Sequence, residues 1–391
     1  MRCGICSYPI SIGLSLDNMP SAAQAFCGKA VESRCKSLTM DIAGCGACGT
    51  VQYVGPNVPY YKNTIRSSKF SETFLEFRQK QFHGFINMLP SKPLSLLELG
   101  AGEGEHLDIF KGLGCLTAGI ENSDELVSLA QQKGHAMYQG FLDGSNDLPN
   151  LSEQKFGCVV SFNFIEHLPS PRASLLQLAS LLIEDGYGLF EVPNFNMIDE
   201  FKLFNEFIPD HRFYFKEDTF QTLLSLSGFE IQSIETIWDN YIISACVKKR
   251  RVAGWRGYDE ERDSLKAQLE LFFECTNPEQ NVVWGAGHQS LATISNLRLE
   301  QYLSCVIDSS TKKQNTFCPG SRLPVYSPDV LRKRQDAVPW HTAHRLPVVL
   351  QVRVGFFDPP LPVVPTRAER LQALMRPNCP RHEPKLQPLS Q

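Results

Sequence analysis

A glycine-rich turn is the first place in this sequence where the types and spacing of the residues could do chemistry. Residues 96–106 read LLELGAGEGEH, in which an apolar run predicts a buried strand and a helical pattern follows the glycines. Gly100, Gly102 and Gly104 allow a sharp turn and let a ligand approach the backbone amides at the start of the helix. Glu105 stands where a dinucleotide-binding turn has its third glycine, which argues against a nicotinamide or flavin.

An Asp-His pair inside an aromatic stretch is the second candidate for chemistry. Asp210 and His211 lie within residues 201–215, which contain several phenylalanines. Apolar walls exclude water, and an adjacent carboxylate can fix the imidazole tautomer, which makes histidine a usable base near neutral pH. The residues alone leave two interpretations open: His211 is such a base, or it only satisfies a buried backbone group.

Two Cys-x-x-Cys pairs near the N-terminus form the third candidate. Cys3 with Cys6 and Cys45 with Cys48 could offer four thiolates to one tetrahedral zinc ion. Free thiols are the alternative, and a redox role is disfavoured because no βαβ pattern surrounds either pair. The odd number of cysteines, 13, favours thiols or metal ligands over disulfides.

Alternating strand and helix patterns are expected to position the first two candidates. Residues 94–249 alternate in the order of a doubly wound α/β sheet, with one of the helices over residues 172–184. Residues 230–236 and 241–247 predict a closing hairpin. The fold class predicted for this part of the chain is therefore a Rossmann-like domain with a mixed sheet.

Polar residues follow several of the predicted strands. Glu121 ends the apolar run after the glycine turn, Asn163 ends a later one, and Glu166 and His167 follow closely. Ligands of open α/β sheets bind outside the carboxyl ends of the strands. These side chains are therefore expected to face a common ligand.

At these residues the sequence resembles the S-adenosylmethionine-dependent methyltransferases of the Rossmann-like class, over about residues 70–249. The resemblance implies that the glycine turn binds S-adenosylmethionine and that Glu121 binds its ribose. The cofactor-binding residues that it implies are Glu98, Gly100, Gly102, Gly104, Glu121 and Asn163.

Further motifs resemble the zinc-containing C-methyltransferases that act on nucleotide-linked deoxysugars. They are the cysteine pairs, NFIEHLP at residues 163–169, EVPNF at 191–195, and Asp210-His211 before an aromatic pair. The resemblance implies His211 as the catalytic base, Asp210 as its supporting acid, and Glu166 with His167 as a second active-site pair. Ile208 stands where the best-known sugar enzymes carry tyrosine, which leaves the substrate open.

The family has three domains in a fixed order, and 391 residues exceed what one core usually holds. The predicted limits are 1–69 for a zinc-binding N-terminal domain, 70–249 for the methyltransferase domain, 250–334 for a C-terminal Rossmann-like domain, and 335–391 for a proline-rich tail. The C-terminal domain is predicted to repeat the strand, glycine turn and strand plan and to contact substrate or phosphate in preference to NAD. Whether it is complete in this chain is left open.

The tail departs from the rest of the chain. Ten of the 25 prolines fall in residues 331–391, where the βα alternation is lost, so this segment is expected neither to complete a parallel sheet nor to be well ordered. A divergent tail and a shifted reading frame are both left open.

Composition narrows the class of function. A net charge of −4 gives no basic field for nucleic acid, no apolar run reaches the ~20 residues of a membrane span, and no signal peptide is recognisable. A cytoplasmic enzyme acting on a small molecule is therefore expected, its oligomeric state open. The alternatives are an O- or N-methyltransferase, an NAD-dependent oxidoreductase, and a zinc-stabilised binding protein without catalysis.

Overall fold

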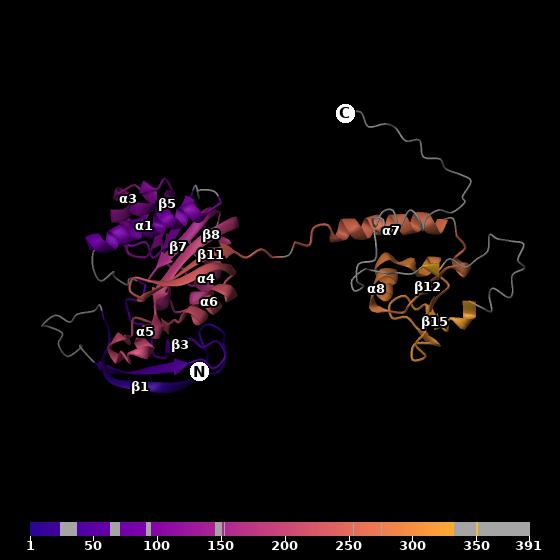
Figure 1. The fold of residues 1–391 in the computed structure, drawn as a ribbon, viewed down its shortest axis with the longest axis horizontal. Helices are drawn as coiled ribbons and strands as arrows, with labels where there is room; N and C mark the ends of the chain where they lie inside the picture. The colour runs from indigo at the N-terminus through magenta and orange to yellow at the C-terminus, as the bar shows by residue number, and fades with distance from the viewer. Residues whose placement is uncertain are drawn as a thin grey trace, which may run out of the picture. The chain divides into compact units, whose positions relative to one another are not determined.

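The structure is a computed structural model, and the chain divides into two compact units, Met1–Val252 and Ala253–Gln391 (Figure 1). The residues that it describes are 1–23, 37–62, 71–90, 95–144, 151, 153–252, 254–274, 276–331 and 349–350. None of the helices in these ranges is long and apolar enough to cross a membrane.

A seven-stranded sheet with the order β10-β11-β8-β7-β4-β5-β6 forms the centre of the first unit. All neighbours pair in parallel except β11, which runs antiparallel to both β8 and β10. The predicted mixed sheet with a closing hairpin is thereby confirmed. The strands are β4 (Ser95–Leu99), β5 (Leu116–Glu121), β6 (Ala136–Gln139), β7 (Phe156–Phe162), β8 (Leu182–Pro193), β10 (Phe229–Ile237) and β11 (Ile242–Lys249).

The direction of strand addition reverses beside β4. The chain adds β5 and β6 on one side of β4 and then returns to add β7 and β8 on the other. Open α/β sheets bind their ligands at such a switch point, outside the carboxyl ends of the strands. The turn after β4 is therefore placed where a ligand is expected.

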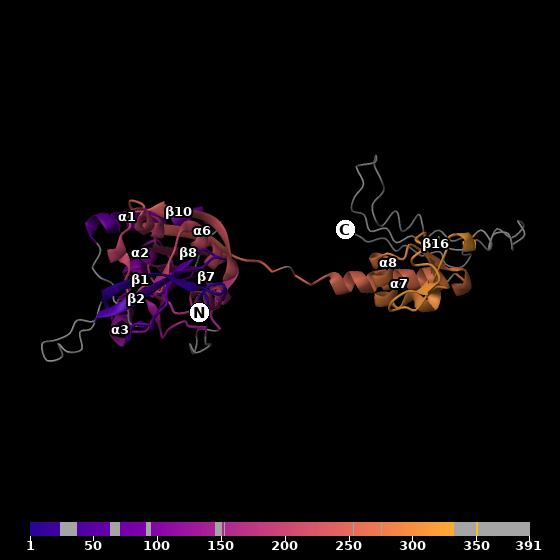
Figure 2. The same ribbon diagram turned by 90° about the horizontal axis from the view of Figure 1, so that it is seen from below.

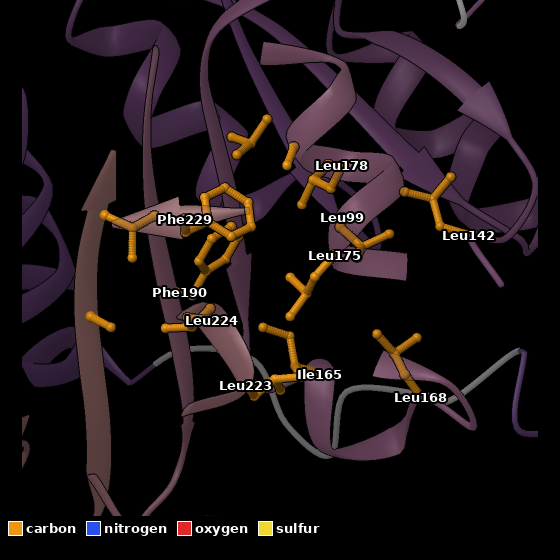
Figure 3. Close-up of a cluster of buried hydrophobic side chains, with 14 of the residues drawn as sticks. Leu99, Leu142, Ile165, Leu168, Leu175, Leu178, Phe190, Leu223, Leu224 and Phe229 are labelled. Carbon is orange, nitrogen blue, oxygen red and sulfur yellow. The ribbon is translucent and has the colours of Figure 1, made fainter. Parts of the chain in front are cut away.

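Helices cover both faces of this sheet, because successive side chains of a strand point to opposite sides. Leu97 and Leu99 of β4 belong to a core that includes residues of α4 and α6, which Figure 3 shows around Leu175, Leu178 and Leu223. Leu96 belongs to a second core formed with α1 and α2. The helices of this unit are α1 (Glu72–Met88), α2 (Glu105–Gly112), α3 (Asp124–Gln132), α4 (Pro171–Ser180), α5 (Phe195–Glu200) and α6 (Glu217–Leu226).

A fully buried ion pair joins α1 to the sheet. Nη1 of Arg78 lies 2.5 Å from a carboxylate oxygen of Glu191 on β8. The other carboxylate oxygen of Glu191 accepts hydrogen bonds from Gln81 and Ser244. The rings of Phe74, Phe77, Phe82 and Phe162 surround the guanidinium of Arg78. Removal of either partner of such a buried ion pair leaves the other charge without its opposite charge and destabilises the fold.

The helix expected over residues 172–184 is shorter than predicted. It ends at Ser180, and β8 begins at Leu182. Leu182 pairs with Phe156 of β7, and a register shift follows before Tyr187 pairs with Cys158. Pairing with a distant strand therefore takes residues that the local pattern assigned to a helix.

The N-terminal segment forms an antiparallel sheet with the order β1-β2-β3-β9. Its strands are β1 (Ser11–Pro20), β2 (Ser37–Gly44), β3 (Val51–Tyr53) and β9 (Phe213–Tyr214). The last strand comes from the aromatic stretch that contains His211. Met40 and Tyr53 of this sheet share a core with Phe195 of α5 and Phe207, and the indigo strands lie against α5 in Figure 1.

The second unit carries its own small sheet, of order β14-β15-β13-β12-β16. The strands β12, β13, β15 and β16 are parallel, as a Rossmann-like unit requires, and Figure 2 shows α7 and α8 of this unit. Its elements are α7 (Tyr258–Glu274), β12 (Val282–Trp284), α8 (His288–Leu297), β13 (Cys305–Ile307), β14 (Thr316–Phe317), β15 (Pro324–Tyr326) and β16 (Val349–Leu350).

The tail contributes to this sheet, contrary to the expectation from its proline content. Val349 and Leu350 pair in parallel with Val282 and Val283 of β12. They lie in a short apolar run, VVL, that contains no proline. The expectation of poor order for the remaining tail falls on residues outside those described.

Candidate active site

The glycine turn between β4 and α2 has the conformation that its sequence predicts. Gly100, Gly102 and Gly104 all have positive φ angles, of 76°, 55° and 85°. A Cβ atom on Gly100 would lie 2.6 Å from the ring of Phe164, whereas one on Gly102 would meet nothing within 4 Å. The turn is thus closed by Phe164 at Gly100 and open at Gly102.

Glu121, at the end of β5, is bound to this turn. One carboxylate oxygen accepts the amide hydrogen of Gly102 at 3.1 Å. The other accepts the amides of Asn122 and Ser123 at 2.8 and 2.9 Å. A carboxylate offers about four acceptor positions, so Glu121 can accept a further hydrogen bond, for example from a ribose hydroxyl.

Glu98 and Asn163 flank the turn from two neighbouring strands. Glu98 is fully buried, and its carboxylate lies 2.8 Å from Nδ1 of His106 on α2. Asn163 directly follows β7 and has a φ of 47°, and its amide donates to the carbonyl of Glu191. Glu98 therefore ties the strand before the turn to the helix after it.

The structure brings Glu166, His167 and His211 together beside the turn. Oε1 of Glu166 lies 3.8 Å from Nε2 of His167, and the rings of His167 and His211 meet edge to face with centroids 4.7 Å apart. Phe164, which packs on Gly100, precedes Glu166 by two residues. The carboxyl and imidazole groups therefore lie next to the predicted cofactor turn.

Burial sets the protonation of these three groups. Burial raises the pKa of the Glu166 carboxyl to about 8. Burial, with a smaller effect of the neighbouring His167, lowers the pKa of His211 well below its usual range. Burial also lowers the pKa of His167, against an opposing effect of the Asp210 carbonyl. At neutral pH the cluster therefore holds a protonated carboxyl and two neutral imidazoles, and neutral imidazole can accept a proton.

The carboxylate of Asp210 does not contact the imidazole of His211, contrary to the expectation that it fixes the tautomer. Its two oxygens accept hydrogen bonds from the Tyr60 hydroxyl at 2.7 Å and the Ala23 amide at 2.9 Å. Its backbone carbonyl instead lies 2.9 Å from Nδ1 of His167. Asp210 thus orients His167 through its backbone carbonyl and does not orient His211, because its side chain is directed toward the N-terminal segment.

Two adjacent tyrosines connect the histidine loop with the cofactor turn. Tyr60 binds Asp210, and the ring of Tyr61 packs edge to face on Phe141, which in turn contacts Phe164. Sequence reasoning gave no definite role to either tyrosine. The sequence marks them as an aromatic pair in an otherwise polar segment, from which they could reach a substrate.

The four N-terminal cysteines converge on one point. The sulfurs of Cys3 and Cys48 are 3.6 Å apart, those of Cys6 and Cys45 are 3.5 Å apart, and all four lie within 4.8 Å of one another. Tetrahedral zinc with Zn–S bonds of about 2.3 Å places its sulfurs at about 3.8 Å, so the donor set fits this ion. Burial raises the pKa of Cys45, but hydrogen bonds from the backbone amides of Cys48 and Ala47 lower it. The resulting pKa of Cys45 is about 7.

The second unit repeats the contact between an acid and a glycine turn. The carboxylate of Asp308 accepts hydrogen bonds from the amides of Ala286 and Ser310, both at 2.8 Å, and from Lys313 at 3.2 Å. Burial opposes the effect of these donors, which together lower the pKa of Asp308. Asp308 therefore holds the turn at Gly285 as Glu121 holds the turn at Gly102.

Comparison with known families agrees with this geometry. Residues 74–234 match the family described as a methyltransferase domain, and residues 245–348 match the C-methyltransferase C-terminal domain. Both matches support an S-adenosylmethionine-dependent methyltransferase of class I. The second match includes residues beyond 334, where the resemblance was expected to end.

Individual relatives of this methyltransferase are distant. It is 21% identical to the C-methyltransferase NovU of Streptomyces niveus, over 60% of this chain and 62% of NovU. The solved structure of the PH0226 protein of Pyrococcus horikoshii is 15% identical to this chain, with a TM-score of 0.40. The match covers 49% of this chain and 98% of the PH0226 chain. The CcbJ methyltransferase of Streptomyces caelestis is 12% identical, with a TM-score of 0.37 over 49% and 95%.

Proposed function

We propose that the protein transfers a methyl group from S-adenosylmethionine to a carbon next to a carbonyl in a small metabolite, with His211 as the base. The observation that carries this proposal is the grouping of His211 with Glu166 and His167 beside the glycine turn, where burial lowers the pKa of His211 and favours its neutral imidazole. The match to a C-methyltransferase C-terminal domain supports carbon as the acceptor. A nucleotide-linked sugar is the substrate class that we favour.

The chemistry asked of the residues is proton abstraction and positioning. The cofactor would supply a methyl group that its positive sulfur activates and releases, and the residues would remove the proton from the substrate carbon that receives it. His211 accepts that proton, and a base so placed contributes typically ~10²–10⁴-fold. The residues assigned to hold the cofactor are the glycine turn, Glu121 and Asn163, with Glu98 supporting the turn through His106.

Methylation of oxygen or nitrogen uses a base in a different way, and this gives a test. A carbon acid exchanges its proton with solvent once the base has formed the enolate, whether or not the methyl group is transferred. Exchange of the α-proton of a candidate ketone in heavy water, followed by NMR, therefore supports carbon as the acceptor. Two results together would contradict carbon as the acceptor. The α-proton would not exchange in the absence of cofactor, and the product would carry the new methyl group on oxygen or nitrogen.

We further propose that Cys3, Cys6, Cys45 and Cys48 hold a structural zinc ion, as their sulfur spacing allows. Such an ion would fix the N-terminal segment, whose Ala23 and Tyr60 donate to Asp210. We also propose that the domains span residues 1–69, 70–249 and 250–334.

Zinc content tests the cysteine site. Protein purified in metal-free buffer is expected to contain one zinc ion per chain by elemental analysis, and Cys45→Ser is expected to lose it, because three ligands hold the ion more weakly. Cys318→Ser, which changes a buried cysteine of the second unit, should keep the zinc and serves as the control. Undiminished zinc in Cys45→Ser would rule out this site.

Gly102→Val tests the cofactor turn. The added side chain enters the open space above the turn, so binding of S-adenosylmethionine should weaken at least ~10-fold in calorimetry, a change of about 1.4 kcal/mol or more. Gly114→Val is the matched control, because Gly114 also has a positive φ and open space around its Cβ position but lies after α2. Equal loss of binding in both variants would attribute the effect to backbone strain.

A further inference from the structure

The cluster of Glu166, His167 and His211 has a donor set that suits a metal ion. One donor atom from each residue lies within 4.8 Å of the others, and the carboxylate oxygen of Glu166 is 3.8 Å from Nε2 of His167. Ligands about 2.0–2.1 Å from a tetrahedral zinc ion lie about 3.3 Å apart, so side-chain shifts of about 1 Å would complete the site. Two imidazoles and one carboxylate favour zinc, cobalt, nickel or copper over magnesium or calcium.

The second nitrogen of His167 is already arranged as in a metal ligand. Nδ1 donates to the backbone carbonyl of Asp210 at 2.9 Å, which leaves the lone pair of Nε2 facing Glu166. Histidines that bind metals almost always donate their other N–H to a carbonyl or carboxylate in this way. The loop therefore presents His167 in the tautomer that coordination needs.

One oxygen of the buried Glu166 carboxyl has no hydrogen-bond partner among the described residues. Its side chain is 2% exposed, and its Oε2 makes no hydrogen bond with the residues that the structure describes. Burial of a polar oxygen without a partner costs free energy, which a bound cation would offset. This independent observation points to a ligand at the same place as the two histidines.

We propose that Glu166, His167 and His211 bind one divalent transition-metal ion, with zinc as the reference ion, at a site separate from the four cysteines. The Glu166 carboxyl releases its proton to solvent when the ion binds. The bound ion occupies the nitrogen of His211 that would otherwise accept a proton. Metal binding and proton abstraction therefore exclude each other, and excess zinc inhibits the enzyme. The inhibition rests on the proposed function, whereas the binding does not.

Zinc stoichiometry tests the binding without any assay of activity. After equilibrium dialysis against micromolar free zinc, the parent protein should hold one more zinc ion per chain than Glu166→Gln or His167→Asn. His83→Asn, which changes an exposed histidine of α1, should hold as much zinc as the parent. Equal zinc in the parent and in both cluster variants would overturn the proposal, whatever the content of the cysteine site.

Cobalt gives a second measurement on the unmodified protein. Cobalt held by cysteines shows intense thiolate charge-transfer absorption, whereas cobalt held by two histidines and a carboxylate shows only weaker visible bands. Addition of cobalt to protein whose cysteine site already contains zinc should produce the weaker bands alone. Absence of any new band at saturating cobalt would overturn the proposal even if the variants fail to fold.

Activity then tests the exclusion. Excess zinc should lower turnover at least ~10-fold, because base catalysis is removed, and a chelator should restore it. Turnover that rises with zinc would overturn the exclusion and make the ion an activator. A protein that binds the extra zinc, but transfers no methyl group even after the chelator has removed that zinc, would leave the site standing and count against the proposed function.

Discussion

Replacement of His211 by asparagine is expected to lower turnover by ~10²–10⁴-fold while S-adenosylmethionine binding is unchanged. Asparagine keeps some hydrogen bonding in the cluster but removes the basic nitrogen. Steady-state kinetics gives the turnover, and calorimetry with the cofactor shows whether the binding site is intact. The rate should stay high as pH falls through 6.5, because burial lowers the pKa of His211 and keeps it neutral there.

Proton exchange separates the base role from a structural one. In heavy water without cofactor, the parent enzyme should exchange the proton next to the substrate carbonyl, and His211→Asn should not. His83→Asn, on the exposed face of α1, should behave as the parent. Near-normal turnover in His211→Asn would exclude this residue and make His167 the next candidate.

Substitution of Arg78 by methionine is expected to lower the free energy of unfolding of the first unit by about 3–5 kcal/mol. Arg78 and Glu191 are fully buried, and removal of the cation leaves the carboxylate of Glu191 without its opposite charge. Methionine keeps an apolar stem among the surrounding phenylalanine rings. Urea denaturation followed by circular dichroism measures the change.

A double variant and a surface variant control this experiment. Arg78→Met combined with Glu191→Gln should recover part of the loss, because no unpaired charge remains buried. Arg251→Met removes an exposed partner of Asp185 and should change stability little. If Arg251→Met lowered the free energy of unfolding as much as Arg78→Met does, burial of the ion pair would not explain the effect.

The sequence predicted the elements that depend on local pattern. The glycine turn follows β4, Glu121 ends β5, and the closing hairpin forms at β10 and β11, because apolar periodicity and glycine positions are local properties. The end of α4 was placed too late, since pairing of Leu182 with Phe156 decides where β8 begins. Likewise β16 forms although prolines surround it in sequence.

The candidate site was predicted by residue type but not by contact. Glu166 and His167 follow the carboxyl end of β7, and His211 lies close to them although α5 separates it in sequence from the end of β8. The partners of Asp210 are not local: the hydroxyl of Tyr60 and the amide of Ala23 reach it from the N-terminal segment. No pattern within either segment carries that information, because the contact exists only after the two sheets have formed.

The strand β9 has a consequence for synthesis of the chain. Its residues pair with Val51 and Gln52, yet they are translated only after most of the central sheet. At ~5–20 residues per second, β3 waits roughly 10–30 s on the ribosome for its partner. During that interval the unpaired edge of β3 is open to neighbouring nascent chains, so a ribosome-associated chaperone that covers the first emerging residues should raise the yield of folded protein.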